Sequence, residues 1–396
     1  MNLLVYLHSM NGGGAERVTA NLANYWAAQG WTVTIATIEP ASRDFYELHP
    51  AIQRVELGLA ARGNGLVEAL TRNLARIRTL RGLILEVRPD AVLSMMTNAN
   101  VILALACRGM PDVCAVGSER HYPGHVWLNP IWSVLRRIHY GGLQAVVAQT
   151  SECAAWILQH TRARQAPVIP NSATWPLPAQ SPVVVPDKVC RPGRRILLGA
   201  GRLVEQKNFA VLIEVFARMA ARHPDWDLVI LGKGPLHDDL RRQAEAAGLG
   251  DRVFLPGLVG NPGDWYAQSD LYVMTSHFEG FPNTLVEALA HGVPVVSYDC
   301  DTGPRDIIRH GTDGLLIPLD DAQALHDGLD AVMGDEALRC RLAARAGEAR
   351  ERFSIERVAA MWEALFRQGV LHPDMRELSS PPEAARRDCL QRSAGG

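Results

Sequence analysis

The sequence between Ser276 and Pro294 reads SHFEGFPNTLVEALAHGVP. Pro282 stands where a first helical turn tolerates proline, the apolar residues after it recur at helical spacing, and Gly292 ends the segment. A helix that begins here directs free backbone N–H groups and the positive end of its dipole toward whatever lies before it, which suits a phosphate. The stretch therefore predicts a turn and helix of an α/β fold, with an anion site at the helix start.

Two glutamates, Glu279 and Glu287, stand eight positions apart in this stretch. Glu279 would lie in the loop before the helix, and Glu287, about two turns into it, would reach toward the same ligand. Because a phosphate repels carboxylates, their natural partners are hydroxyl groups, such as those of a ribose and of a sugar ring. Two ordinary glutamates on a solvated helix are the alternative.

A second glycine-bearing turn follows an apolar strand predicted at residues 196–198. It runs from Gly199 to Asn208 as GAGRLVEQKN and precedes an amphipathic segment at residues 209–221. Arg202 can fork onto phosphate oxygens, and Lys207 adds a second positive charge. Ligands gather at the carboxyl ends of the strands in parallel α/β sheets, so we expect both turns to face one ligand.

These segments resemble a known family, the retaining glycosyltransferases of family 4. The similarity extends from Leu3 to about Phe366, and four stretches carry it: NGGGAERV at residues 11–18, GRLVEQKN at 201–208, EGFPNTLVEALAHGVPVV at 279–296 and DTGPRDIIRHGTDGLLI at 301–317. The resemblance implies a GT-B fold, in which two doubly wound Rossmann-like domains face each other across a cleft. It also implies transfer of a hexosyl group from a nucleotide diphosphate sugar to an acceptor hydroxyl, with retained configuration.

The resemblance also implies site residues. The donor-binding set is Gly13, Gly14, Arg202, Lys207, Glu279, Gly280, Phe281, Pro282, Asn283, Thr284, Leu285 and Glu287. In this set Glu279 would contact the sugar and Glu287 the ribose, while Arg202, Lys207 and the helix N–H groups would stabilise the departing diphosphate. The catalytic residues are predicted to be Glu279, Arg202, Lys207 and His121.

Two loops of the first half are expected to face this donor site. Gly13 and Gly14 let the backbone approach a ligand closely at a helix start, although a tight strand-to-helix turn would use them equally well. Arg120 and His121 follow another strand and are predicted on the acceptor side. Relatives commonly carry a histidine where Arg120 stands. Either His121 takes that role, or Arg120 steadies the phosphate, or His121 is an ordinary loop residue.

No metal and no cofactor are predicted; the donor would be a UDP- or GDP-sugar. Asp299 and Asp301 resemble a metal-binding D-x-D motif, but two carboxylates alone leave most of a hard cation's shell to water. Gly199 and Gly201 lack the third glycine of the dinucleotide fingerprint, which disfavours an NAD enzyme. A nucleotide-sugar epimerase and a non-catalytic nucleotide-sugar-binding protein remain alternatives.

Short apolar runs alternate with helical segments, which predicts two parallel sheets. The strands are expected at residues 3–7, 32–37, 91–94, 113–117 and 145–149, and at 196–198, 228–231, 252–254, 271–274, 294–298 and 314–317. Prolines concentrate between Pro167 and Pro192. The predicted organisation is a first domain (1–178), a linker (179–193), a second domain (194–370) and a disordered tail (371–396). The family resemblance implies that the first domain is the acceptor side, that the second binds the nucleotide sugar, and that the last helix packs back on the first domain.

Composition limits the partners and the compartment. The net charge of −2 over 396 residues gives no reason to expect nucleic acid, and seven scattered cysteines without C-x-x-C spacing predict reduced thiols in the cytoplasm. The first strand is too short and lacks the basic flank of a signal peptide. A glycan or a lipid-linked molecule is the expected acceptor, since the matched segments recur in enzymes of bacterial surface polysaccharide, lipopolysaccharide and lipid-linked oligosaccharide assembly.

The first half also carries features of a membrane surface. Residues 1–180 hold 15 arginines, no lysine and 11 acidic residues. Aromatic, aliphatic and basic side chains recur in two predicted helices: Trp127, Leu128, Ile131, Trp132, Leu135, Arg136 and Arg137 in one, and Arg72, Arg76, Arg78 and Arg81 in the other. We expect peripheral contact with an anionic membrane, at the inner face of the plasma membrane. A helix packed on the sheet with a solvated basic face is the alternative.

Overall fold

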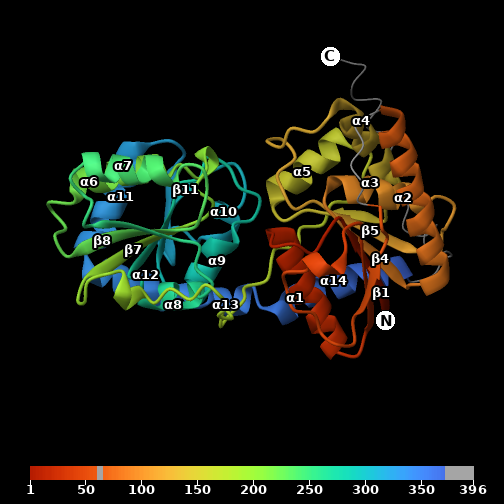
Figure 1. The fold of residues 1–396 in the computed structure, drawn as a ribbon, viewed down its shortest axis with the longest axis horizontal. Coiled ribbons are helices and arrows are strands. Elements are labelled where there is room, and N and C mark those ends of the chain that lie inside the picture. The colour runs from red at the N-terminus through yellow and green to blue at the C-terminus, as the bar shows by residue number, and fades with distance from the viewer. Residues whose placement is uncertain (60–65, 371–396) are drawn as a thin grey trace, which may run out of the picture.

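The computed structural model describes residues 1–59 and 66–370, which form two α/β domains side by side (Figure 1). The tail predicted at 371–396 lies outside the described residues. The predicted fold class, two doubly wound parallel sheets, is confirmed, because each domain has a six-stranded sheet in which every pair of neighbouring strands is parallel.

The first sheet has the strand order β3-β2-β1-β4-β5-β6. Its strands are β1 (Asn2–Leu7), β2 (Thr32–Thr37), β3 (Gln53–Glu56), β4 (Ala91–Met95), β5 (Cys114–Ser118) and β6 (Ala145–Val147). The connecting helices are α1 (Gly14–Ala28), α2 (Leu66–Val87), α3 (Thr97–Ala106), α4 (Pro130–His139) and α5 (Ser151–His160). The order reverses between β1 and β4, where Leu3 lies opposite Val33 on one side and Ala91 on the other.

The second sheet repeats this topology, with the order β12-β11-β10-β7-β8-β9. Its strands are β7 (Arg195–Ala200), β8 (Trp226–Leu231), β9 (Val253–Gly257), β10 (Leu271–Met274), β11 (Val295–Asp299) and β12 (Gly314–Pro318). The helices are α6 (Phe209–Met219), α7 (His237–Ala246), α8 (Pro262–Gln268), α9 (Asn283–Ala290), α10 (Pro304–Ile307), α11 (Ala322–Gly334), α12 (Glu336–Ala346) and α13 (Ala349–Arg352). This order reverses between β7 and β10, so both candidate ligand loops, after β7 and after β10, leave the sheet at the reversal point.

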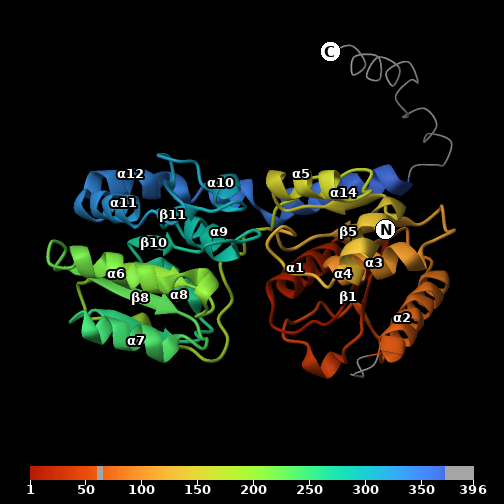
Figure 2. The ribbon, with the colours of Figure 1, turned by 90° about the horizontal axis from the view of Figure 1, so that it is seen from above.

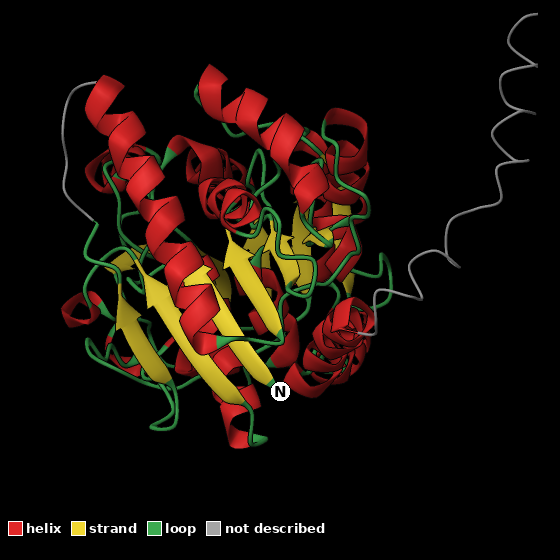
Figure 3. Ribbon diagram, turned by 90° about the vertical axis from the view of Figure 1, so that its right-hand side faces the viewer, coloured by secondary structure: helices red, strands yellow, loops and turns green. Residues whose placement is uncertain are grey.

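Helices cover both faces of each sheet, as the apolar strands require. Figure 3 shows helices on both faces of the first sheet. There α1 packs on one face, and α2, α3 and α5 pack on the other. In the second domain α6, α7 and α11 cover one face, while α8 and α9 cover the other. Each domain therefore has two apolar layers of its own.

The last helix, α14 (Ile355–Val370), crosses from the second domain and packs on the first (Figure 2). Its side chains Trp362 and Phe366 are fully buried, and the ring of Phe366 meets the edge of Trp26 on α1 at 5.8 Å between centroids. Truncating a buried aromatic of this size typically costs about 3–5 kcal/mol. The helix therefore fixes the two domains to each other at a second place besides the segment that joins them.

The predicted linker packs on the second domain. Gln180 N–H donates to the carbonyl of Gly260, and Val184 exchanges hydrogen bonds with the Asn261 side chain. Cys190 is buried in the apolar layer under α8 and α9. These contacts hold the segment on the surface of the second domain.

The strand β3 is missing from the sequence prediction. Its residues, QRVE, are only half-buried or exposed because it is the edge strand of the first sheet. An edge strand with one apolar residue has neither the continuous apolar run of a buried strand nor a clear alternation. Its pairing with β2, with Ile35 opposite Arg54, comes from the tertiary structure.

Candidate active site

A cleft of about 620 Å³ opens between the two domains. It lies beyond the carboxyl ends of β1 and β5 in the first domain and of β7 and β10 in the second. Residues of both domains line it: the segment Gly12 to Arg17, Arg120, His121 and Asn171 from the first domain, and Arg202, Glu279, Gly280, Phe281 and Asn283 from the second. Two separately predicted loops of one domain thus face two of the other.

The glycine loop of the first domain forms one wall. Gly13 is the N-cap of α1, its carbonyl accepts a hydrogen bond from the Tyr46 hydroxyl at 3.0 Å, and Gly14 begins the helix. A Cβ at Gly14 would stand 3.7 Å from the Asn283 side chain of the second domain. The free N–H groups at the start of α1 therefore face the cleft, close to the start of α9 in the second domain.

The turn after β7 places Arg202 on the opposite wall, and Lys207 lies beside that wall through its contact with Glu279. Lys207 Nζ lies 2.5 Å from Glu279 Oε1, and both side chains are largely buried. Arg202 is exposed to the cleft and makes no ion pair within the described ranges. Lys207 therefore already has an anionic partner, whereas Arg202 is available to a ligand.

The helix α9 presents its start to the cleft, and its apolar side chains point away from it. Phe281 packs edge-on against Phe353 at 5.8 Å, and Leu285 is fully buried. These two side chains belong to the core of the second domain, so any donor contact by Phe281 or Leu285 would be through the backbone. The Asn283 side chain accepts a hydrogen bond from Asn171 at 2.6 Å and so joins the two domains.

Glu287 is bound to the first domain. Its carboxylate lies 2.5 Å from the Arg17 guanidinium and accepts a further hydrogen bond from the Tyr266 hydroxyl at 3.2 Å. The charge of Glu287 raises the pKa of Arg17. The carboxylate that the sequence assigns to a ribose is thus occupied by a cation from α1 in this closed arrangement.

Arg120 and His121 stand at the end of β5, under the second domain. A Cβ on Gly280 would meet the Arg120 carbonyl at 3.0 Å, so any larger residue would push these two closely packed loops apart by a few tenths of an ångström. Partial burial lowers the pKa of His121, the charges of Arg120 and Arg202 lower it further, and Glu279 opposes them. His121 is therefore neutral at neutral pH, and it lies close to charged groups of both domains.

Asp299 and Asp301 have separate partners. Asp299 is held by Arg305 at 3.0 Å, whereas Asp301 lies 2.7 Å from His125 Nε2. In the described part of the chain, no three His, Cys, Asp or Glu side chains gather as a group that could bind a metal ion. The Asp301–His125 contact is instead another link between the two domains.

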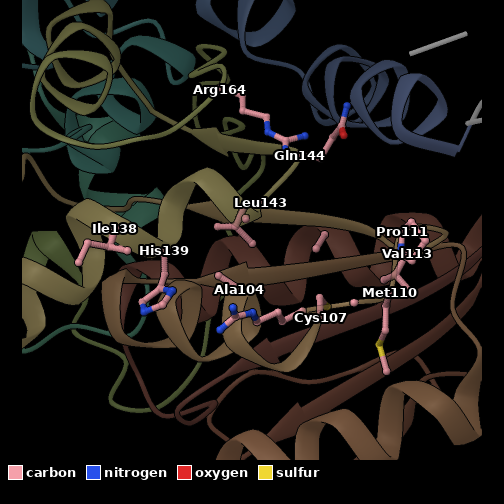
Figure 4. A pocket seen from close by; sticks show the side chains of 14 residues that line it. Ala104, Cys107, Met110, Pro111, Val113, Ile138, His139, Leu143, Gln144 and Arg164 are labelled. Atoms are coloured by element: carbon pink, nitrogen blue, oxygen red, sulfur yellow. The ribbon is translucent and has the colours of Figure 1, made fainter. Parts of the chain in front are cut away.

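A second cavity, of about 550 Å³, lies in the first domain where α3 ends and β5 and β6 begin (Figure 4). Arg108 and Arg164 make it basic, and none of the predicted site residues lines it. It adjoins the amino ends of the strands, whereas ligands of parallel α/β sheets bind at the carboxyl ends. The interdomain cleft is therefore the candidate active site.

Comparison with known proteins agrees with this geometry. A family model described as Glycosyltransferase Family 4 matches residues 12–173, and one described as Glycosyl transferases group 1 matches residues 186–349. One model therefore falls in each domain. The chain is a glycosyltransferase with the GT-B fold.

Individual relatives of this glycosyltransferase match it either over part of its length or at low sequence identity. The exopolysaccharide phosphotransferase SCO2592 of Streptomyces coelicolor is 40% identical over 174 residues, which are 44% of this chain and only 18% of that protein. The GalNAc-alpha-(1->4)-GalNAc-alpha-(1->3)-diNAcBac-PP-undecaprenol alpha-1,4-N-acetyl-D-galactosaminyltransferase of Campylobacter jejuni is 24% identical over 92% of this chain and 98% of that protein. The solved sucrose-phosphate synthase of Thermosynechococcus elongatus has a TM-score of 0.75 at 19% identity, covering 92% of this chain and 98% of that one.

The structure adds residues to the site of this glycosyltransferase that sequence reasoning missed. Arg17, Tyr46, Gln149 and Asn171 all line the cleft. Arg17 directly follows the glycine loop, within the NGGGAERV segment, so its position next to that motif is a signal that could have identified it. Asn171 lies in the proline-rich stretch, and no local pattern marks it, because its position depends on how the two domains meet.

Proposed function

We propose that the protein transfers a hexosyl group from a UDP- or GDP-sugar to an acceptor hydroxyl, with retention of the anomeric configuration. The observation that carries this proposal is the interdomain cleft. There the glycine loop at the start of α1, the exposed Arg202, the Lys207–Glu279 pair and the start of α9 surround one space. A diphosphate fits the positive groups, and a sugar fits the carboxylate.

The chemistry breaks the bond between the anomeric carbon and the diphosphate oxygen and forms a bond from that carbon to the acceptor oxygen. The proton of the acceptor hydroxyl passes to the leaving diphosphate oxygen, from which it is released to solvent. Negative charge grows on the leaving diphosphate. Arg202, Lys207 and the backbone N–H groups at the starts of α1 and α9 would stabilise it. These groups supply the positive charge that a metal ion supplies elsewhere, so we propose metal-independent transfer without a cofactor.

Donor binding exchanges partners at both glutamates. Lys207 would turn from Glu279 to the phosphate, which frees Glu279 for sugar hydroxyl groups. Glu287 would exchange Arg17 for the ribose hydroxyls, and His121 would lie beside the reacting sugar. Closure of the domains over the donor would then exclude water from the reacting carbon.

Two observations support a lipid-linked acceptor: the name of a relative and the apolar surface of the first domain. The Campylobacter relative carries an undecaprenol-linked sugar in its name. In this chain, Ile131, Val134 and Ile138 are exposed at helical spacing along α4, and Trp127, in the loop just before α4, extends this row and is 82% exposed. An apolar groove of about 470 Å³ between α2, α3 and α4 adjoins this row. Exposed apolar patches of this kind mark interaction sites.

We propose that the α4 row rests on the inner face of the plasma membrane, with the protein otherwise in the cytoplasm. Among the described helices, none combines the length and apolar character needed to cross a membrane. Arg137 is exposed beside the row and suits anionic lipid headgroups. Arg136, which the sequence grouped with it, is buried and stacks over Trp156 at 4.5 Å. The basic contribution of α4 is therefore Arg137 alone.

Incubation with a panel of UDP- and GDP-sugars and a lipid-linked acceptor extract tests the proposed activity. We expect sugar transfer to the lipid fraction with one donor, and an anomeric configuration in the product, assigned by NMR, that matches the donor. An epimerase would instead change the donor without acceptor, and a binding protein would bind the donor without turnover. Either result would overturn the proposal.

Sedimentation with anionic vesicles tests the membrane contact. We expect wild-type protein to pellet at low salt and to be released at high salt, because each arginine near the surface contributes about 1 kcal/mol that salt screens. The double variant Trp127→Ser/Arg137→Glu should stay in the supernatant. Arg357→Glu, an exposed position on α14, is the matched control and should pellet like wild type. Equal pelleting of all three would refute the assignment of this surface.

A further inference from the structure

Arg120 is a buried cation without a counter-ion. Its side chain is 6% exposed, its Nη1 donates to Ser118 Oγ at 3.3 Å and its Nη2 donates to the Asn171 side chain. Its Nε is buried and has no hydrogen-bond partner. Within the described ranges no carboxylate forms an ion pair with it, unlike Arg17, which is paired with Glu287.

Such an arrangement is costly in the free protein. A buried charge is normally paired, and an unsatisfied buried N–H carries the full desolvation penalty. Burial accordingly lowers the pKa of Arg120 to about 10; the Cys153 thiol opposes this shift, but no carboxylate does. Because Arg120 lines the active-site cleft, a bound anion would supply the missing partner.

The diphosphate of the donor is not the best candidate for that anion. The second domain already provides Arg202 and Lys207 for it, whereas Arg120 comes from the end of β5 in the first domain. His121, next in the chain, is influenced by both Arg202 and Glu279. Arg120 therefore adjoins the part of the cleft where the proposed function puts the transferred sugar, and the following inference rests on that function.

We propose that Arg120 recognises a carboxylate on the transferred sugar, so that the donor is a nucleotide-linked hexuronic acid. The guanidinium fork matches a carboxylate in two parallel hydrogen bonds. The unpartnered Nε would supply one of them, and Nη2, released from the Asn171 side chain, would supply the other. The depth of Arg120 favours the donor over the acceptor, because the acceptor must approach from solvent after the donor is bound. Glu279 then contacts ring hydroxyls at a distance from the carboxylate.

Calorimetry with a nucleoside diphosphate, its hexose and its hexuronate separates the contributions of the diphosphate, the sugar ring and the sugar carboxylate to binding. UDP, UDP-glucose and UDP-glucuronate are compared, together with GDP, GDP-mannose and GDP-mannuronate if the protein binds guanine rather than uracil. We expect wild type to bind the uronate at least about tenfold more tightly than the matching hexose. Arg120→Gln should weaken uronate binding about 10- to 100-fold, as loss of a charge-assisted contact does, and leave the nucleoside diphosphate almost unchanged.

Two further variants sharpen the test. Arg120→Lys keeps the charge but loses the fork, so it should retain only part of the preference for the uronate. Arg164→Gln, which removes an exposed arginine of the first domain outside the cleft, is the control and should leave the ratio of uronate to hexose affinity unchanged. The wild-type preference alone tests the proposal if the Arg120 variants fail to fold.

The outcomes are distinct. Equal wild-type affinity for uronate and hexose overturns the inference and leaves Arg120 to an anion of the acceptor. An equal loss in Arg120→Gln for all three ligands also overturns it, because Arg120 would then hold the diphosphate. Absence of any nucleoside diphosphate binding would instead refute the proposed function itself.

Discussion

Lys207→Ala should weaken nucleoside diphosphate binding more than Arg202→Ala, although both remove one positive charge. In the free protein Lys207 is paired with Glu279 at 2.5 Å, while Arg202 has no ion pair among the described residues. Removing Lys207 therefore also leaves the Glu279 carboxylate without its partner in a cleft that must accept a diphosphate. Removing Arg202 has no such second consequence.

The expected magnitudes follow from these contacts. A hydrogen bond to a charged group contributes about 1.5–3 kcal/mol, so Arg202→Ala should weaken binding about 10- to 150-fold. The unpaired Glu279 would repel the diphosphate by a further 1–2 kcal/mol or so, a value between the limits for water and for a pair near a protein surface. Lys207→Ala should therefore exceed Arg202→Ala by about tenfold in the dissociation constant.

Isothermal calorimetry with UDP and GDP measures these differences, and a double variant isolates the repulsion. Lys207→Ala/Glu279→Gln removes the orphaned charge and should bind the diphosphate about tenfold more tightly than Lys207→Ala. If the double variant binds no better than the single one, Glu279 does not lie close enough to the diphosphate to repel it. If neither Arg202→Ala nor Lys207→Ala changes the affinity, the cleft is not the nucleotide site.

Three further predictions concern the same cleft. Arg17→Met should destabilise the closed interface by up to about 3 kcal/mol, because it leaves Glu287 without its partner. This is the low end for breaking a buried ion pair, since the interface can open and hydrate the carboxylate. Thermal unfolding measures the loss, and the double variant Arg17→Met/Glu287→Gln should recover part of it. Chelator should leave sugar transfer intact, and loss of activity that Mn²⁺ or Mg²⁺ restores would return Asp299 and Asp301 to a metal role. The pKa of His121 is lowered in the folded protein, so the unfolded chain binds the proton first as pH falls below about 6.5 and stability should decrease there. His121→Gln should show a smaller decrease in melting temperature over that range, and an identical pH profile would contradict the assignment.

Local sequence patterns predicted the architecture because each buried strand is a short apolar run between turn signals. Leu271 to Met274 and Thr32 to Thr37 begin and end where the patterns indicated. The edge strand β3 escaped because half of its environment is solvent, so its composition carries little signal. The packing of α14 on α1 is a long-range contact, and the sequence prediction of it came from the family resemblance rather than from periodicity.

The candidate site shows a similar division. The sequence predicts the glycine loop, Arg202 and Glu279, because each stands in a short local motif whose residue types indicate its chemistry. All of them line the cleft. The partners of Glu287 and Arg120 were not found, since Arg17 and Asn171 are 270 and 51 residues away in the chain. The sequence also did not predict which side chains of α4 are buried. Arg136 and Arg137 are neighbours in the sequence, yet Arg136 is buried against Trp156 and Arg137 is exposed.

The ion pairs of the free cleft give a physical reason for its closed arrangement. Arg17 of the first domain pairs with Glu287 of the second, and Lys207 pairs with Glu279 within the second domain. Both glutamates are the groups assigned to donor hydroxyls, so the protein satisfies them internally when no donor is present. Since a buried ion pair gains little over its desolvation cost, hydroxyl groups and a diphosphate can replace these partners at a small net cost. The donor would therefore exchange contacts within the cleft, and the domains would part only far enough to admit it.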